Sequence, residues 1–468
     1  MEPVVLDGAT LTAPAIARIA REHAPVELTV QARARNAAAR RAVEAVLARG
    51  DELYGASTGV GPLREHRVEP GDREDHQLAL LRSHACGAGR ELPEELVRAA
   101  MATRANQLGA GGAGVVDELL DALVDALNAG AIPVTRELGS LGTGDLTALA
   151  DIALALVGDG RVRLGPRDGL AFMSSNAVTI AHAALLVEDA SALLDRWLTV
   201  AALSFEAAGA DTVVLDPRVH AGRHLPGQVA VAARMLEILD GVGGRTRPGT
   251  LVQDPYPFRA LPQVDGVVQE ALIALDQVVT HELNFAGENA LIVAADEVAL
   301  ANGNPHAAVL ANAIDGLRTA LAQSAALIAA RVSALLDTSL TGLPAFLALD
   351  PGPDSGALIL EYTAHASAAE VRSLVTPVAA QTVSVARGVE SHASLAPIAA
   401  RRAHEALDAL RVLVAVELVA AVRALRLAGH EPIGAGCHLL YAQAAAVLPD
   451  DMTDRPLAPD IEIARGLL

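Results

Sequence analysis

The second half of the chain repeats one pattern, in which Ala, Leu and Val recur at helical spacing over long stretches. The stretch from Glu405 to Arg426 is apolar over most of its circumference, so it should lie deep in a bundle or at an oligomer interface. Helices of this length bury their apolar faces against one another. The pattern therefore predicts a mainly α fold built around a long helical bundle, with helices at 263–283, 308–338, 355–382 and 398–428.

The composition favours the same fold. Of the 468 residues, 52% are hydrophobic but only 2% are aromatic, so the core must consist of many aliphatic contacts, which suits long helices packed side by side. We expect one continuous structural unit, with an N-terminal part at residues 1–200 and a central and C-terminal helical bundle at residues 201–468. Residues 241–257 are rich in Gly and Pro and should form a long functional loop.

Charge and cysteine content exclude several classes of partner. The formal net charge is −20, whereas nucleic acids and anionic membranes are bound through clustered Lys and Arg, so neither is an expected partner. Cys86 and Cys437 are too few for a disulfide scaffold, which favours reduced, intracellular thiols. The first residues do not resemble a secretory signal, and the uncharged run Gly169–Val187 is better explained as the start of a buried helix than as a membrane span. We expect a cytoplasmic protein.

A glycine-rich loop near residue 140 opens directly into a helix. Residues 139–146 read GSLGTGDL, and a largely apolar helical pattern follows through Val157. Such a loop leaves unpaired backbone N–H groups at the positive end of the helix dipole, where an anion or a backbone-derived electrophile can be held. No Lys follows the glycines and no strand pattern precedes them, which disfavours a nucleotide phosphate site.

Two loops of the N-terminal part carry a specific resemblance, together with shorter segments further along. Residues 54–61 (YGASTGVG) resemble a Tyr-Gly-x-Asn-Thr-Gly-Phe-Gly loop, and residues 139–146 resemble a Gly-Ser-x-Gly-Ala-Ser-Gly-Asp-Leu loop. The other matching segments are Ser83-His84-Ala85, residues 252–259 with Pro262-Gln263, Glu288-Asn289, residues 303–306, Glu390-Ser391-His392 and residues 458–462. Their shared order along nearly the whole chain resembles the family of histidine and aromatic amino-acid ammonia-lyases and the related aminomutases.

The resemblance implies an all-α homotetramer of the ammonia-lyase (fumarase/aspartase-like) type. Its active sites would draw loops from three subunits and bind a small-molecule substrate. The family's cofactor, methylideneimidazolone (MIO), is made from the chain itself, when the Gly nitrogen of Ala-Ser-Gly attacks the Ala carbonyl and two waters leave. In the family, the MIO takes the substrate amine and a tyrosine removes the β-proton. No cofactor is therefore expected as a separate molecule.

The matched motifs give each candidate residue a role. Tyr54 would be the base and Arg259 the clamp for the substrate carboxylate, since a guanidinium matches a carboxylate in a fork. A tyrosine hydroxyl is a weak base near neutral pH, so Tyr54 would need the field of Arg259 and of helix ends. Tyr256 and Asn289 would hydrogen-bond near the electrophile and the carboxylate, and Glu390 would face the amine.

Taken singly, these residues have ordinary structural explanations. A lone Tyr54 or Tyr256 is more often a half-buried core residue with a satisfied hydroxyl, and a lone Arg259 is usually ion-paired at the surface. Only the ordered set of motifs raises the functional interpretation above these explanations.

The acidic and histidine residues need the same comparison. His84 would shape the side-chain pocket, although a lone histidine is more often packed than catalytic, and Glu390 alone could cap a helix. His306, His392 and Glu390 lack the compact spacing of a zinc site, so no metal is expected.

The chain departs from the family at the electrophile loop. Anchored on Asp145, the Ala-Ser-Gly motif falls on Gly142, Thr143 and Gly144, and the loop is one residue shorter. Dehydration of Thr143 would leave an ethylidene carbon that is more hindered and less electrophilic than the family's methylidene. The shorter loop also works against bringing the Gly144 nitrogen onto the Gly142 carbonyl. A self-derived MIO at these positions is therefore doubtful.

Further departures lie on the cofactor and amine side. Ser174, a candidate substrate-binding residue, begins a Ser-Ser-Asn-Ala segment where the family has Asn-Gly-Thr-Gln, so an asparagine associated with the electrophile is lost. Ser57 replaces an Asn in the tyrosine loop, Pro305 replaces a frequent Phe, and Val389 stands where histidine lyases have Gln. Pro305, Val389 and the altered segment at 174–177 argue against histidine as the substrate.

We therefore expect a lyase that kept the tyrosine base and the clamp for a carboxylate or carbonyl but lost or altered the MIO. It would perform elimination, the reverse addition, or an addition that closes a ring. One alternative is an ordinary ammonia-lyase or 2,3-aminomutase with an electrophile derived from Thr143. Another is a non-catalytic tetrameric binding scaffold, against which the retention of Tyr54, Tyr256 and Arg259 argues.

Overall fold

The computed structural model describes residues 1–158, 160, 162–243 and 252–468. Its internal contacts group the chain into two units, each made of three segments. Unit 1 comprises Met1–Glu188, Leu275–Asp315 and Pro377–Arg401, and unit 2 comprises Asp189–Ala274, Gly316–Thr376 and Arg402–Leu468. Four of the five boundaries fall inside long helices, α8 (Ala177–Ala208), α12 (Leu261–Leu283), α13 (Ala308–Leu336) and α16 (Ala396–Ala428), and the fifth, between Thr376 and Pro377, lies outside the helices. The expected division into an N-terminal part (1–200) and a helical bundle (201–468) stays a prediction.

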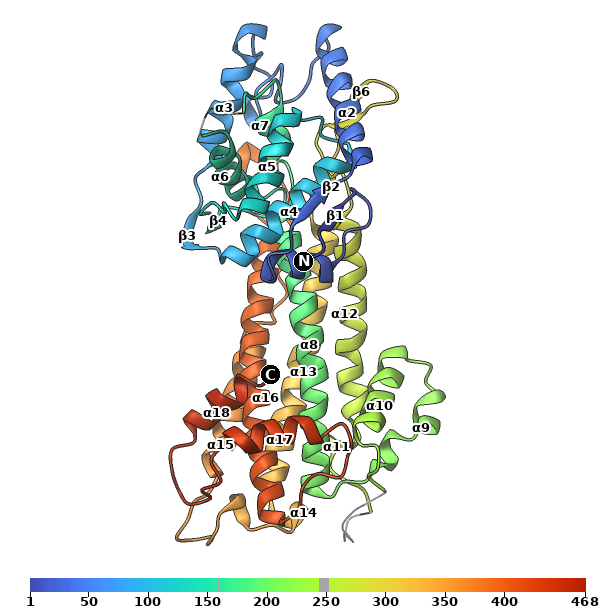
Figure 1. Cartoon of the computed structure of the whole chain (residues 1–468), viewed down its shortest axis with the longest axis vertical. Helices are drawn as coiled ribbons and strands as arrows, with labels where there is room; N and C mark the ends of the chain where they lie inside the picture. Colours follow the sequence, from blue (N-terminus) through green and yellow to red (C-terminus); the bar gives the residue numbers. More distant parts are fainter. Residues whose placement is uncertain (159, 161, 244–251) are drawn as a thin grey trace. The chain divides into compact units, whose positions relative to one another are not determined.

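Helices dominate unit 1, as the mainly α prediction requires (Figure 1). Its complete helices are α1 (Ala13–Arg21), α2 (Val30–Ala48), α3 (Arg73–His84), α4 (Glu94–Ala110), α5 (Asp117–Ala129), α6 (Leu146–Val157) and α7 (Asp168–Met173). Short 3-10 turns lie at Gly61–Leu63, Pro70–Asp72 and Ala386–Gly388.

The strands of unit 1 are short and form three two-stranded sheets. β1 (Val4–Leu6) pairs in parallel with β2 (Val26–Leu28). The antiparallel pairs are β3 (Ala88–Glu91) with β4 (Arg136–Leu138), and β5 (Leu291–Val293) with β6 (Val298–Leu300). β4 leads into the loop of residues 139–146, so the small β3–β4 sheet helps to position that loop.

The core of unit 1 is organised around α4, which is buried along nearly its whole length and contacts α1, α2 and α5. In α5 one apolar face is buried, and Gly130 ends the helix in the left-handed conformation at φ 69°. The buried apolar positions of α5 are Leu119, Leu120, Leu123, Val124 and Leu127.

Unit 2 contains the bundle that the second half of the sequence predicts. Segments of α8, α12, α13 and α16 run side by side in it (Figure 1). Arg331 on α13 pairs at 2.7 Å with Glu417 on α16, to which Ser204 on α8 also donates at 2.7 Å. Ser324 on α13 donates to Asp265 on α12 at 2.6 Å. The buried charges of Arg331 and Glu417 neutralise each other, so a bundle of aliphatic helices can carry them.

Shorter elements complete unit 2. The 3-10 turns are Thr212–Leu215 and Ala345–Leu347. The helices are α9 (Pro217–Ala221), α10 (Pro226–Ile238), α11 (Tyr256–Arg259), α14 (Thr338–Thr341), α15 (Leu358–Ser373), α17 (His438–Val447) and α18 (Ala458–Arg465). Of the loop predicted at residues 241–257, residues 244–251 lie outside the described part of the chain.

One predicted helix was too long. The expected helix at 355–382 is observed as α15, which ends at Ser373. Pro377 explains the early end, because proline lacks the N–H that continues a helix and disfavours helical backbone in the residue before it. The other three long helices agree with the predicted bounds to within two residues at each end.

Two stretches, Asp168–Ala208 and Ala308–Leu336, are long and apolar enough to cross a membrane by length and composition. Their most apolar windows are 94% and 61% buried inside the structure, and a core helix passes the same test of length and composition. The uncharged run at 169–187 lies in the first stretch, in agreement with its interpretation as buried. The cytoplasmic location stays a prediction.

Candidate active site

The Gly142 carbonyl is held by two donors in unit 1. Its oxygen accepts hydrogen bonds from the Ser394 hydroxyl at 2.9 Å and from the backbone N–H of Ala307 at 3.0 Å. Gly142 adopts a left-handed φ of 85°, and a Cβ added there would lie 2.0 Å from the Ser394 oxygen. Glycine therefore fits this position, and the alanine that the family motif has there would collide with Ser394.

The Gly144 nitrogen is held by an asparagine that the sequence comparison did not assign. Gly144 N–H donates to Asn176 Oδ1 at 3.0 Å, and the Asn176 amide donates to the Pro305 carbonyl at 2.6 Å. Asn176 is buried, as is Ser174 at the end of α7. The family's asparagine is absent at position 174, but Asn176, two residues later, contacts the loop. Aligning the motif with a shift of two residues would have identified Asn176 from the sequence.

Thr143 and Glu390 form the central polar pair of this site. The Thr143 hydroxyl donates to Glu390 Oε2 at 2.7 Å. Glu390 follows the 3-10 turn at Ala386–Gly388, and its carbonyl accepts the N–H of Val385 at 2.9 Å, which fixes the backbone of this segment. A carboxylate beside a hydroxyl can bind the ammonium group of a substrate. The structure thus brings together two residues that the motifs placed at the amine end.

Asp145 fastens the loop to the start of α8. Its carboxylate accepts hydrogen bonds from the Ser140 hydroxyl at 2.6 Å, the Thr179 N–H at 2.7 Å and the Thr179 hydroxyl at 2.9 Å. Complete burial raises the pKa of Asp145, while these donors work in the opposite direction. An acceptor at the N-terminal turn of a helix satisfies N–H groups that have no partner within the helix.

Side-chain oxygens of the Tyr54 loop accept hydrogen bonds from backbone N–H groups within or next to the loop. The Tyr54 hydroxyl oxygen accepts the Gly61 N–H at 2.7 Å, a contact that strengthens when the oxygen carries negative charge. Ser57, which replaces the family's Asn, accepts the Leu53 N–H at 2.8 Å. The loop is thus closed by Ser57 without the asparagine, and Tyr54 is partly buried within it.

Two other predicted residues make mainly local contacts. Nδ1 of His84 lies 2.8 Å from the Leu80 carbonyl oxygen, one turn earlier on α3. Asn289 Oδ1 accepts the Asn302 N–H at 3.2 Å. Their roles toward a substrate stay predictions.

Tyr256 and Arg259 lie together in unit 2. They form the two ends of α11, and the Arg259 guanidinium lies over the Tyr256 ring at 4.3 Å from its centre. Arg259 Nη1 donates to Gln253, whereas its buried Nε has no hydrogen-bond partner among the described residues. Arg259 also lines a cavity of about 390 Å³ with Gln253, Asp211, Asp254 and four valines. The convergence of this group with Tyr54 and Thr143 stays a prediction.

Two histidines of unit 1 contact each other. His306 Nε2 and His392 Nδ1 are 2.9 Å apart and share a hydrogen bond. Within the described ranges, no group of three or more His, Cys, Asp or Glu residues could hold a metal ion.

Comparisons with known proteins show the family to which the chain belongs. The sequence profile described as aromatic amino acid lyase matches residues 11–446. Histidine ammonia-lyase from Symbiobacterium thermophilum is 36% identical over 491 aligned positions, which cover 100% of this chain and 97% of the relative. These relatives confirm the predicted lyase, and they disfavour the non-catalytic scaffold.

Solved structures show the same fold. Ergothionase from Treponema denticola, described as an ergothioneine-degrading enzyme, has a TM-score of 0.94 at 27% identity and covers 100% of this chain and 98% of its own. Tyrosine aminomutase from Streptomyces globisporus has a TM-score of 0.94 at 28% identity and covers 99% and 96%. The helical ammonia-lyase fold predicted from the motifs is therefore confirmed. The chain is a lyase that belongs to the aromatic amino acid lyase family.

Proposed function

We propose that this lyase uses Tyr54 for proton transfer at carbon and the Thr143–Glu390 pair at the amine end of the substrate, while residues 142–144 stay an ordinary peptide. The observation that carries the proposal is the 2.7 Å hydrogen bond from the Thr143 hydroxyl to Glu390. It gives the hydroxyl, which the family's cofactor chemistry would remove as water, a defined partner. The substrate is a small molecule with a carboxylate or carbonyl, and the reaction is an elimination or its reverse, including ring closure.

The surroundings of Gly142 and Gly144 fit an unmodified peptide better than an MIO ring. Ring formation removes the Gly142 carbonyl oxygen, which would leave the buried Ser394 hydroxyl and the Ala307 N–H without this acceptor. It also removes the N–H that Gly144 donates to Asn176. Each buried polar group left unpaired costs about 1–3 kcal/mol. These contacts support a chain that lost the MIO.

The proposed elimination balances without an added co-reactant. The substrate amine binds as an ammonium group against the Glu390 carboxylate. Tyr54, as the phenolate, takes the proton from the neighbouring carbon, the electron pair of that C–H bond forms the double bond, and the C–N bond breaks to release a neutral amine. Tyr54 ends the step as a neutral phenol and releases the proton to solvent to restore the phenolate, whose charge the Gly61 N–H stabilises.

Arg259 would hold the other end of the substrate. Its buried Nε lacks a partner among the described residues and the guanidinium lines a cavity, which is the arrangement a carboxylate needs for a two-point contact. In the proposed homotetramer, this cavity and the Thr143 loop contribute to one shared site.

The names of the relatives suggest the first substrates to test. Histidine ammonia-lyases and an ergothioneine-degrading enzyme are among them, so amino acids and amino acid derivatives come first. Pro305 replaces a Phe that is frequent in the family and Val389 replaces a Gln of the histidine lyases, which argues against histidine itself.

A second candidate is an ammonia-lyase or aminomutase with an electrophile derived from Thr143. One observation favours it: two donors on the Gly142 oxygen polarise the carbonyl carbon that the Gly144 nitrogen would attack, as in an oxyanion hole. Asn176, Ser394 and Glu390 would line such a group, without the hydrogen bonds that Ser394 and Asn176 make to the peptide, and the group would supply an electron sink for the substrate amine.

The intact mass of the purified protein separates the two candidates. A mass equal to that of the unmodified chain supports the first. A deficit of two waters, localised by peptide mapping to residues 142–144, overturns it and supports the second. A panel of amino acids and unsaturated acids, followed by their ultraviolet absorbance, then identifies the substrate class.

A further inference from the structure

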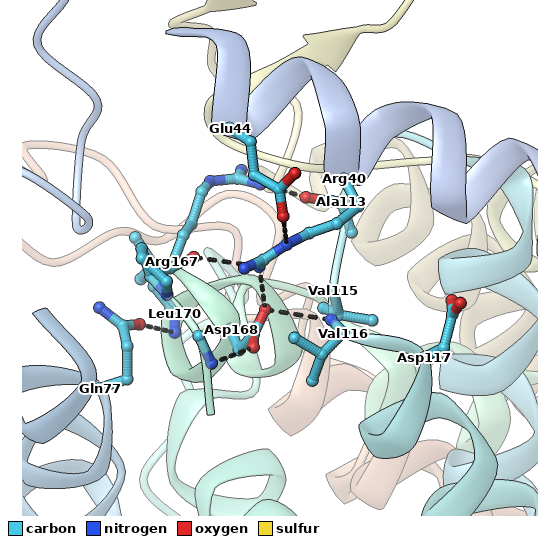
Figure 2. A network of polar contacts seen from close by, with 12 residues as sticks. Arg40, Glu44, Gln77, Ala113, Val115, Val116, Asp117, Arg167, Asp168 and Leu170 are labelled. Carbon is cyan, nitrogen blue, oxygen red and sulfur yellow. Dashed lines mark hydrogen bonds and ion pairs between the residues drawn. The ribbon is translucent and has the colours of Figure 1, made fainter. Parts of the chain in front are cut away.

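Gln77 connects the Tyr54 loop to helix α7. It lies on α3, and its side chain is fully buried. Its amide donates to the Gly55 carbonyl at 2.8 Å, and its carbonyl oxygen accepts the Leu170 N–H at 3.2 Å. One carboxamide therefore uses its donor on the loop that carries Tyr54 and its acceptor on the first turn of α7, where Figure 2 shows it beside Leu170.

The same two segments also interlock through packing. Gly55 has a left-handed φ of 70°, and a Cβ added there would lie 2.0 Å from the Leu170 Cδ2. A Cβ added on Gly169 of α7 would lie 2.7 Å from the backbone carbonyl oxygen of Gln77 on α3. The Gly55 backbone thus lies against the Leu170 side chain and the Gly169 backbone lies against that of Gln77, so a movement of α7 would displace both the residue after Tyr54 and α3.

Helix α7 continues directly to the Thr143 loop. All six of its residues are buried. Two residues after it, the Ser175 carbonyl accepts the Asp145 N–H at 2.6 Å, and the next residue, Asn176, accepts the Gly144 N–H at 3.0 Å. The first turn of α7 thus contacts the Tyr54 loop, and the residues just after the end of α7 contact the Thr143 loop.

Charged residues anchor both ends of this helix. At its start, Asp168 accepts hydrogen bonds from Arg40 at 3.1 Å and from the Val116 N–H at 3.3 Å, as Figure 2 shows. At its end, Arg104 donates to the Phe172 carbonyl at 2.8 Å and pairs with the buried Glu288 at 2.7 Å. These contacts fix both ends of α7 in place.

We propose that Gln77 is a positioning residue that couples the Tyr54 loop, through α7, to the loop that carries Thr143. It sets the spacing between the proposed base and the proposed amine site before any substrate binds. The assignment rests on the proposed function for its catalytic meaning, although the coupling itself is measurable without turnover.

The substitution Gln77→Glu tests the donor specifically. The ionised carboxylate keeps the size and the acceptor for Leu170 but places a negative oxygen against the Gly55 carbonyl in place of an N–H donor. On protonation, the carboxyl group again offers a donor to that carbonyl. The perturbation should therefore appear at high pH and disappear at low pH.

Tyrosine-selective NMR reads the effect directly, because the chain has 4 tyrosines. Tyr54→Phe identifies the Tyr54 resonance. In Gln77→Glu we expect that resonance alone to move at high pH and to return as the pH falls, while the other three stay in place. The matched control is Gln228→Glu, since Gln228 is also buried but bonds His220 in unit 2; it should leave the Tyr54 signal unmoved.

Gln77→Met removes both hydrogen bonds with a side chain of similar length, and covers the case in which Gln77→Glu fails to fold. It should shift the Tyr54 signal at every pH and speed deuterium exchange at Gly144 about tenfold, as expected for the loss of about one hydrogen bond. A folded Gln77→Met protein with an unchanged Tyr54 signal and unchanged exchange at Gly144 overturns the proposal. Full turnover in Tyr54→Phe would instead refute the proposed base and leave this coupling standing.

Discussion

The Thr143 hydroxyl donates a 2.7 Å hydrogen bond to Glu390, across 247 residues of sequence. Thr143 stands where the family has the serine that forms the cofactor, and this contact makes it one half of a polar pair instead. A hydroxyl and a carboxylate together can orient an ammonium group by hydrogen bond and by charge.

Removal of either member of this pair should reduce turnover. Thr143→Val keeps the shape without the hydroxyl, and Glu390→Gln keeps an acceptor without the charge, so both should lower kcat/KM by about 10²-fold or more. Thr143→Ser keeps the hydroxyl and should stay within about tenfold of the parent chain. Steady-state kinetics on the identified substrate measures these effects. Wild-type kinetics in Glu390→Gln would contradict the proposed amine site.

Tyr54→Phe should lower kcat by about 10²–10⁴-fold, the range typical of a lost general base, with little change in stability. The reason is that the phenyl ring keeps the packing but cannot take a proton. Tyr362→Phe is the control, since Tyr362 lies exposed on α15. Circular dichroism and melting curves confirm the fold of both variants. Near-normal turnover in Tyr54→Phe would reject the role of Tyr54.

Sequence reasoning succeeded where a repeating physical pattern was present. The long helices were predicted because aliphatic residues at a period of 3.6 must share one buried face. The exception, α15, ended early because Pro377 lies within the pattern. The paired strands have three or four residues each, too few for a visible alternation, and so no strand was predicted there.

The candidate site could be predicted only in part. Motif order assigned both Thr143 and Glu390 to the site, and the structure joins them by a hydrogen bond, while their role toward a substrate amine stays a prediction. Ser394 and Asn176 were missed, because their contacts with the glycines of the loop depend on how distant segments pack and leave no local pattern. Gln77 was missed for the same reason.

Gly142→Ala should destabilise the protein by a few kcal/mol, roughly the sum of a left-handed backbone cost of about 1–2 kcal/mol and the collision with Ser394. The added methyl group would lie 2.0 Å from the Ser394 oxygen. Ser394→Ala in the same chain removes the colliding atom, so the double variant should recover much of the loss. A double-mutant cycle on the free energy of unfolding measures this coupling. Additive effects would show that Ser394 does not press on position 142.

The pH dependence of stability should report on Asp168. Burial raises the pKa of this carboxyl to about 7, although Arg40 and the N–H groups of Gly165 and Val116 lower it. A carboxyl with a raised pKa in the folded state binds its proton more tightly there than in the unfolded chain. Its contribution to stability is therefore complete below pH of about 4 and is lost as the pH rises through about 7.

The size of this effect is at most about 4 kcal/mol, from roughly three pKa units at 1.36 kcal/mol each. Asp168→Asn does not titrate, so its free energy of unfolding should fall less steeply between pH 4 and 7 than that of the parent chain. Asp145, whose pKa burial also raises, remains in both proteins and cancels in the comparison. Denaturant unfolding at a series of pH values gives the two slopes. Equal slopes would mean that Asp168 stays ionised throughout this pH range, because its ion pair with Arg40 at the start of α7 outweighs the effect of burial.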